Sequence, residues 1–121
     1  MITSEMSYPL RVRAGKPLLA FHVAMRLFNR ALECSANGVV IVDISFPWQP
    51  VIYANPAFER ITGYSADEVV GQNCKLLQGG DEDQPEIETL RAAIKDGREA
   101  TVVLRNYRKD GSMFWNKLSI S

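Results

Sequence analysis

The end of the chain alternates apolar and polar side chains on both sides of an Asp110-Gly111 pair, and no other feature restricts the fold as much. This alternation predicts two strands joined by a tight turn, at about 100–108 and 112–120. A two-residue turn would make the numbers of cross-strand partners sum to 221, and Asn106 and Asn116 would then point to opposite faces. A three-residue loop with a left-handed Gly111 makes that sum even and brings both asparagines to one face.

We prefer the three-residue loop because it separates a nearly pure apolar face from a mixed one. Besides the two asparagines, the apolar face then holds Val102, Leu104, Phe114, Leu118 and Ile120. The other face holds Val103, Arg105, Tyr107, Met113, Trp115 and Lys117. A buried carboxamide without a partner costs about 1–3 kcal/mol, and two of them match a flat heterocycle whose edge alternates C=O and N–H groups. The alternative is that one asparagine lies at a strand edge and bonds to local backbone.

The length and charge of the chain limit the number of domains and the kinds of partner that we expect. The 121 residues suffice for one domain with a single core. Fourteen basic and fourteen acidic residues give a formal net charge of zero, which argues against nucleic acid or an anionic membrane as partner. No apolar stretch approaches the ~18–20 residues of a membrane span, and no export signal is recognised. We therefore expect a cytoplasmic protein whose two cysteines, Cys34 and Cys74, stay reduced.

One helix is expected in the N-terminal part of the chain. Residues 1–16 show little periodicity and are interpreted as a flexible tail. Residues 17–36 have the pattern of an amphipathic helix, with Pro17 in its first turn and a stop at Asn37-Gly38. Its apolar stripe consists of Leu18, Phe21, Met25, Phe28 and Leu32. Two heptads are too few for a coiled coil, so we expect this helix to cover the outer sheet face, within one subunit or exchanged between two.

Residues 37–121 carry the pattern of an α+β domain. Two β-branched runs, 39–44 and 51–55, predict a first hairpin. The helical segments that follow are one capped by Asn55 before Pro56, one opened by a capping box from Ser65 to Glu68, and one from Pro85 to Gly97. Strands therefore bracket a central helical segment, which we expect on one face of an antiparallel sheet.

Between two of these helices lies the segment GQNCKLLQGG (71–80), which places Cys74 between an amide and a cation. Here the sequence resembles the light-oxygen-voltage (LOV) branch of the PAS family, flavin-binding blue-light receptors whose signature reads close to G-x-N-C-R-F-L-Q-G. The resemblance extends to NPAFERITGYSADEVVG (55–71) and NYRKDGSMFWNKLSI (106–120), and it covers the chain from near Asn37 onward. It implies a PAS-like sheet and a blue-light sensing function.

The resemblance also implies a cofactor, FMN, and roles for individual residues. Cys74 is the thiol expected to form a reversible adduct with flavin C4a in light. The other expected contacts are Asn106 and Asn116 at the pyrimidine edge, Gln78 at the ribityl–phosphate chain, Lys75 and Arg91 at the phosphate, and Asn73, Leu104, Phe114 and Leu118 around the ring. Lys75 stands where the family usually has arginine, which keeps the charge and loses the planar two-pronged contact. Leu76 replaces the usual phenylalanine.

The chemistry expected of Cys74 can also be argued from the residues alone. A thiol with an ordinary pKa of about 8.5 stays mostly neutral in an apolar site. The single histidine, His22, falls in the N-terminal helix, so no base is at hand to activate Cys74 as in a hydrolase. A photoexcited flavin needs no such base, because its N5 atom can accept the proton. The alternative is an inert core cysteine, which is also the interpretation of Cys34; no metal site is expected.

The C-terminal end departs from the family pattern. PAS domains have one more strand, which runs between the first and the penultimate strands, and in LOV domains it carries a glutamine that contacts the flavin. With that final core strand missing after Ser121, we expect a vacant ladder, poor stability and weak flavin retention. We accordingly expect not an enzyme but an N-terminal sensor fragment of a larger signalling protein, such as a histidine kinase or a cyclic-di-GMP enzyme.

Two other classes of function compete with the photoreceptor. One is a PAS interaction or redox-sensing module without adduct photochemistry. The other is a small flavin or thiol enzyme, against which the lack of an acid–base pair near Cys74 argues. In either sensor class we expect a homodimer through the outer sheet face or the N-terminal helix, with neither nucleic acid nor membrane as partner.

Overall fold

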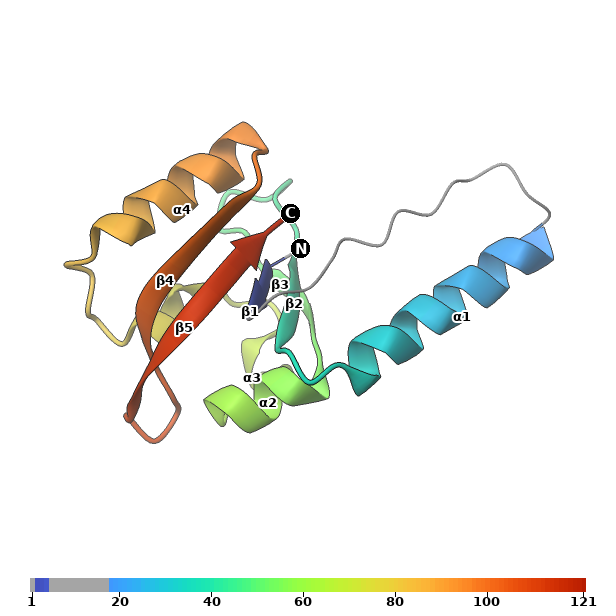
Figure 1. The fold of residues 1–121 in the computed structure, drawn as a ribbon, viewed down its shortest axis with the longest axis horizontal. Coiled ribbons are helices and arrows are strands. Elements are labelled where there is room, and N and C mark those ends of the chain that lie inside the picture. The colour runs from blue at the N-terminus through green and yellow to red at the C-terminus, as the bar shows by residue number, and fades with distance from the viewer. Residues whose placement is uncertain (1, 5–17) are drawn as a thin grey trace.

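Two antiparallel hairpins form the two halves of one sheet, and short helices between them cover one of its faces (Figure 1). The computed structural model describes residues 2–4 and 18–121. The strands of the sheet are β1 (Ile2–Ser4), β2 (Val39–Val42), β3 (Val51–Ala54), β4 (Ala100–Tyr107) and β5 (Met113–Ile120). Their spatial order is β3-β2-β1-β5-β4, and every neighbouring pair is antiparallel. The predicted α+β class is confirmed.

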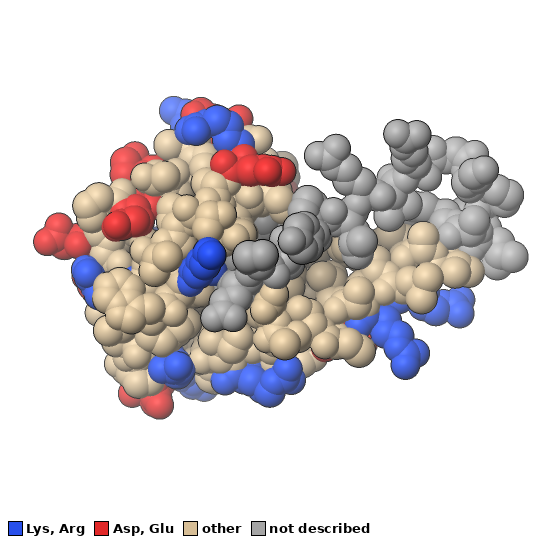
Figure 2. Space-filling model, viewed as in Figure 1, with Lys and Arg blue, Asp and Glu red and all other residues tan. Residues whose placement is uncertain are grey.

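The helical segments between the hairpins are α2 (Pro56–Thr62), α3 (Ala66–Val69), the 3-10 helix η1 (Cys74–Gln78) and α4 (Pro85–Asp96). The helices α2, α3 and α4 begin where the local sequence predicts. Ser65 and Glu68 form the predicted capping box of α3, and Gly97 ends α4 in the left-handed conformation. Acidic residues in the first turn of α4 and a lysine in its last turn complement the helix dipole. Figure 2 shows many of the acidic side chains near α4, and basic side chains both along α1 and over the rest of the domain.

The second hairpin adopts the register that the three-residue loop predicts. Leu104 pairs with Asn116, and Asn106 pairs with Phe114, so both asparagines lie on the same face. Gly111 has a φ of 89°, a left-handed value that a residue with a Cβ rarely adopts. Asn106 and Asn116 are 2% and 5% exposed, which confirms that this face is the buried one.

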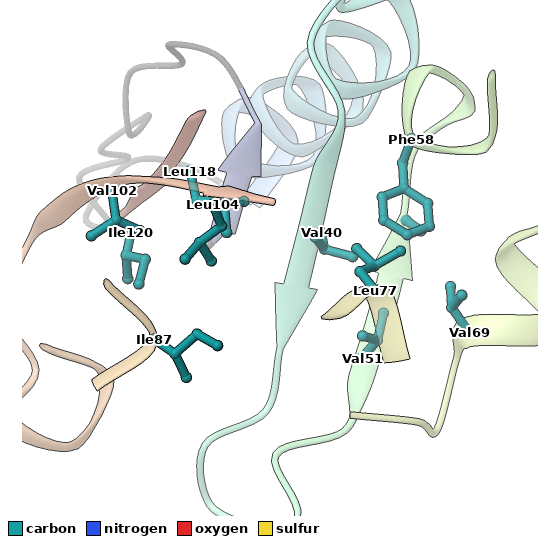
Figure 3. Packing of buried hydrophobic residues seen from close by; sticks show 11 residues of the cluster. Val40, Val51, Phe58, Val69, Leu77, Ile87, Val102, Leu104, Leu118 and Ile120 are labelled. Carbon is teal, nitrogen blue, oxygen red and sulfur yellow. The ribbon is translucent and has the colours of Figure 1, made fainter. Parts of the chain in front are cut away.

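The core lies between this face of the sheet and the helices. Figure 3 shows its side chains converging from both hairpins and from α2, η1 and α4. The labelled members are Val40, Val51, Phe58, Val69, Leu77, Ile87, Val102, Leu104, Leu118 and Ile120. Both halves of the sheet therefore contribute to one core.

A strand fills the middle of the sheet, where the sequence predicts a vacant ladder. β1 lies between β2 and β5, and Ile2 pairs with both Val40 and Ile120. Backbone N–H and C=O groups facing each other across an empty position are costly, so a segment that reaches this position is held there by hydrogen bonds. Residues 2–4, interpreted from the sequence as part of a tail, thus belong to the sheet. The rest of the predicted tail lies outside the described residues.

Within one chain, the N-terminal helix does not cover the outer sheet face, so this part of the expectation is wrong, whereas exchange of the helix between two subunits stays a prediction. The helix α1 (Leu18–Cys34) extends away from the sheet, and Pro17 lies outside the described residues (Figure 1). Leu32, near its C-terminal end, is buried, whereas Leu27 is exposed. Trp115 on the outer face is correspondingly 63% exposed. None of the helices among residues 18–121 combines the length and apolar character needed to cross a membrane.

The direction of α1 is fixed by Asn55, which does more than cap α2. Its side chain is fully buried, and its Oδ1 atom accepts hydrogen bonds from the backbone N–H groups of Val39 at 2.8 Å and Phe58 at 3.0 Å. Its Nδ2 atom donates to the carbonyl oxygens of Leu32 at 2.8 Å and Asn37 at 2.9 Å. One amide therefore joins the end of α1, the start of β2 and the start of α2.

We predict that Asn55→Ala lowers the free energy of unfolding by on the order of 3 kcal/mol, because it leaves several buried backbone groups without partners. Chemical denaturation of the two proteins measures the difference. Ser65→Ala is a suitable control, since it removes the ordinary helix cap of α3. A loss below about 1 kcal/mol in Asn55→Ala, typical of an ordinary helix cap, would contradict this role.

Candidate functional site

A cavity of about 200 Å³ lies inside the core, between the helices and the second hairpin. Apolar side chains such as Val40, Leu77 and Ile87 belong to the core and line the cavity as well. One side of α4 faces it through Leu90 and Ile94 among others. Of the candidate site residues, Asn73, Cys74, Lys75, Gln78, Arg91, Leu104, Asn106, Asn116 and Leu118 line this cavity.

Phe114 is the candidate that the structure does not bring to the cavity. The register places it on the correct face, but it lies next to the hairpin loop and is only half-buried. The guanidinium of Arg108 lies over its ring, 4.6 Å from the ring centroid. Alternation assigns a face to a residue and does not say how far along the strand the cavity extends, so the contact of Phe114 with a ligand stays a prediction.

The sheet side of the cavity presents a pair of amides in an apolar wall. Asn116 Nδ2 donates to Asn106 Oδ1 at 2.9 Å, and Asn106 Nδ2 donates to the Arg105 carbonyl at 3.0 Å. The second bond is the local backbone contact of the alternative interpretation, and both bonds are present together. Among the described residues, Asn116 Oδ1 receives no hydrogen bond, so the pair, which lines the cavity, retains acceptor capacity there.

The helical side of the cavity presents the Cys74 thiol at the start of η1. Asn73 caps this helix through its Oδ1 atom, which accepts from the Lys75 N–H at 2.9 Å. The Nδ2 atom of Asn73 donates to the Trp48 carbonyl at 2.7 Å, which ties η1 to the loop between β2 and β3. Burial raises the pKa of the Cys74 thiol above its ordinary value, to about 11. The thiol is therefore neutral at physiological pH, as the sequence predicts.

Two cations, Lys75 and Arg91, lie where the cavity lining meets solvent. Arg91 Nη1 forms an ion pair with Glu88 Oε2 at 2.8 Å, and the two side chains are 70% and 72% exposed. Exposed pairs of this kind contribute at most about 1 kcal/mol, so Arg91 can exchange this partner for an anionic ligand at little cost.

Sequence reasoning missed two residues that shape the site. Gln49, in the loop after β2, lines the cavity with a left-handed φ of 49°. Gly79 follows η1, and a Cβ at this position would lie 2.8 Å from ring atoms of Tyr107. The glycine that ends the Cys74 motif is thus required for close packing against β4, and the motif itself was the available signal.

A metal site is not found among residues 2–4 and 18–121, since no group of three potential His, Cys, Asp or Glu ligands comes together there. Cys34 and Cys74 are both free thiols.

Comparison with known proteins supports one family. A family profile described as PAS domain matches residues 36–121. The "Bacterioopsin transcriptional activator" of Halobacterium salinarum is 47% identical over 96 residues, which cover 79% of this chain and 14% of that protein. A "Blue-light photoreceptor" of Listeria monocytogenes is 46% identical over 91 residues, covering 75% of this chain and 36% of that protein. The chain thus spans a minor part of the length of these relatives.

Solved structures give the same result. A structure described as an RNA-binding light-oxygen-voltage receptor superposes with a TM-score of 0.81 at 36% identity, covering 98% of this chain and 32% of that one. The LOV protein of Rhodobacter sphaeroides superposes with a TM-score of 0.72 at 41% identity, covering 79% of this chain and 55% of that one.

We predict that Cys74 is alkylated slowly by iodoacetamide at pH 8, because a pKa of about 11 leaves only about 0.1% of the thiol as thiolate. Its rate should rise about tenfold per pH unit up to that pKa, whereas the exposed Cys34 reacts readily at pH 8. Peptide mass spectrometry distinguishes the two sites, and Cys34→Ser is the matched control. A Cys74 rate that is already independent of pH near pH 7 would contradict the raised pKa.

Proposed function

Because the chain belongs to the PAS family and to its LOV branch, we propose that it senses blue light through a reversible bond between Cys74 and a bound flavin. One observation carries the proposal: the neutral thiol of Cys74 and the amides of Asn106 and Asn116 line the same cavity. A thiol near a polar-edged planar ring is the arrangement that such photochemistry needs.

The residues that line the cavity fit an isoalloxazine ring. Its flat faces match the apolar side chains of Leu77, Leu104 and Leu118. Its pyrimidine edge alternates C=O and N–H groups, which the amides of Asn106 and Asn116 can meet with both donors and acceptors. Apolar walls with a few placed polar groups are typical of cofactor sites.

When bound, the flavin supplies light absorption and an electrophilic C4a carbon. Cys74 would supply both the sulfur and the proton: its Sγ–H bond would break, Sγ would bond to C4a as the C4a=N5 double bond opens, and the proton would pass to N5. In the dark the same bonds would re-form in reverse. The raised pKa of Cys74 supports this scheme, because a thiol that stays protonated keeps the proton that the step transfers and is unreactive without light.

FMN is the flavin that we propose, because Lys75 and Arg91 place two positive charges at the solvent side of the cavity. A phosphate at the end of the ribityl chain would neutralise both, and Gln78 also lines the cavity as a neutral donor. Lys75 offers a point charge in place of the planar guanidinium of arginine, so Arg91 supplies the only two-pronged contact of this pair.

We predict that the purified protein with FMN shows a structured absorption band in the blue that bleaches on illumination and recovers in the dark. Cys74→Ser keeps the colour and loses the bleaching, because it removes the sulfur and little volume. Cys34→Ser is the matched control and bleaches normally. Release of the flavin by denaturation identifies it. Persistent adduct-type bleaching in Cys74→Ser would contradict the role of Cys74, and a protein that takes up no flavin would contradict the proposed function.

A PAS interaction or redox module without adduct photochemistry is the second candidate. It is favoured by the same burial of Cys74, since a thiol with a pKa of about 11 is inert unless light activates a partner. The dark and light spectra described above decide between the two functions. In either case we propose a sensory rather than a catalytic role, with the output in other parts of a longer protein, as in relatives named blue-light-activated histidine kinases.

We also propose that two chains associate through α1 or through the outer sheet face, because each exposes large apolar side chains such as Leu27 and Trp115. We predict that light scattering shows a dimer for the wild-type protein and a monomer for one of two variants, Leu27→Glu or Trp115→Glu. The variant that is monomeric identifies the interface. A wild-type protein that is monomeric at all concentrations would contradict dimer formation.

A further inference from the structure

Gln84 occupies an unusual position at the start of α4. It is the N-cap residue, yet its side chain forms no capping hydrogen bond. The side chain is buried and directed to β4 instead. Its Oε1 atom accepts from the Arg105 N–H at 2.7 Å, and its Nε2 atom donates to the Arg105 carbonyl at 3.1 Å and to the Asp81 carbonyl at 2.9 Å. One amide thus satisfies both backbone groups of a single strand residue.

The hydrogen bonds from the Gln84 side chain take the place of those that a neighbouring strand would make to the Arg105 backbone. β4 is the last strand in the order of the sheet, so the backbone groups of Arg105 that point away from β5 have no strand to pair with among residues 2–4 and 18–121. An unpaired edge of this kind is mobile and open to other chains. Gln84 fixes the edge at Arg105, next in sequence to Asn106.

The Arg105 carbonyl connects this edge to the cavity. It accepts one hydrogen bond from Gln84 Nε2 and a second from Asn106 Nδ2 at 3.0 Å, which uses both of its lone pairs. Asn106 Oδ1 in turn accepts from Asn116 Nδ2. The orientation of the amide pair in the cavity therefore depends on where Gln84 holds the Arg105 peptide group.

The Arg105 side chain strengthens the same attachment. Its Nε and Nη2 atoms donate to the two carboxylate oxygens of Asp81, at 2.7 and 3.0 Å, and the Tyr107 hydroxyl also donates to Asp81 at 2.7 Å. The turn from Asp81 to Gln84 thus holds both the main chain and the side chain of Arg105. A two-pronged contact of this kind fixes direction as well as distance.

We propose that Gln84 is a positioning residue for the ligand site: through the Arg105 peptide it sets the orientation of the Asn106 amide and thereby the affinity of the cavity for the pyrimidine edge of the flavin. The proposal rests on the proposed function for its ligand, but its structural part concerns only residues of this chain and can be tested without flavin.

The first test uses the flavin-free protein. The side-chain NH₂ resonances of Asn106 are identified by their loss in Asn106→Ala, and their exchange with solvent is measured in wild type and Gln84→Leu. We expect this exchange to rise about tenfold in Gln84→Leu, with less than a twofold change at backbone amides of the β4–β5 ladder. Glu86→Gln, an exposed change in the same helical turn, should alter neither. An equal rise along the whole ladder would show general loosening and overturn the proposal.

The second test is a double-mutant cycle with FMN. Gln84→Leu should raise the Kd about tenfold in the wild-type background and less than twofold when Asn106→Ala is already present, because Gln84 acts through Asn106. Equal factors in both backgrounds would overturn the proposal. If Gln84→Leu does not fold, Gln84→Glu serves in both tests, since it keeps the acceptor for the Arg105 N–H and loses the donor to the Arg105 carbonyl. If wild type binds no flavin, the proposed function fails and the exchange measurement alone decides the role of Gln84.

Discussion

The hydrogen bond between Asn116 and Asn106 is the constraint on which the cavity depends. Two carboxamides can lie in an apolar wall only if they satisfy each other and retain one further partner. That condition requires both side chains on one face, and Gly111 provides it by allowing the three-residue loop. A loop shorter by one residue would turn one amide to the outer face and remove the polar edge of the site.

Local sequence patterns predicted the features that depend on interactions between residues close together in the sequence. The register of the second hairpin, the capping box at Ser65 and the end of α4 at Gly97 follow from residues within a few positions of each other. The candidate site was largely predictable as well, because alternation and one motif placed its residues. The position of β1 and the direction of α1 were not, since both depend on contacts between distant segments. Asn55 shows why: four hydrogen bonds to separate elements are invisible in a pattern that only marks it as a cap.

The core of this domain contains a cavity that is lined by core residues themselves. Leu77, Leu104 and Leu118 are core residues and also cavity lining, so the chain alone leaves part of its apolar surface without packing partners. Atoms that face a void lose dispersion contacts, and a ligand that fills the void restores them. Ligand binding and stability are therefore linked in this fold, because any molecule bound only by the folded state stabilises it.

The helix α1 extends from the domain and is attached to it at one end, so a small rotation at the attached end moves the other end a long way. A helix of 17 residues is about 25 Å long, and its attachment to the domain lies at one end, around Leu32 and Asn55. A rotation of about 10° at this pivot displaces the far end by about 4 Å, which is about the rise of three helical residues. A small rearrangement near the sheet therefore produces a larger displacement at the far end of α1.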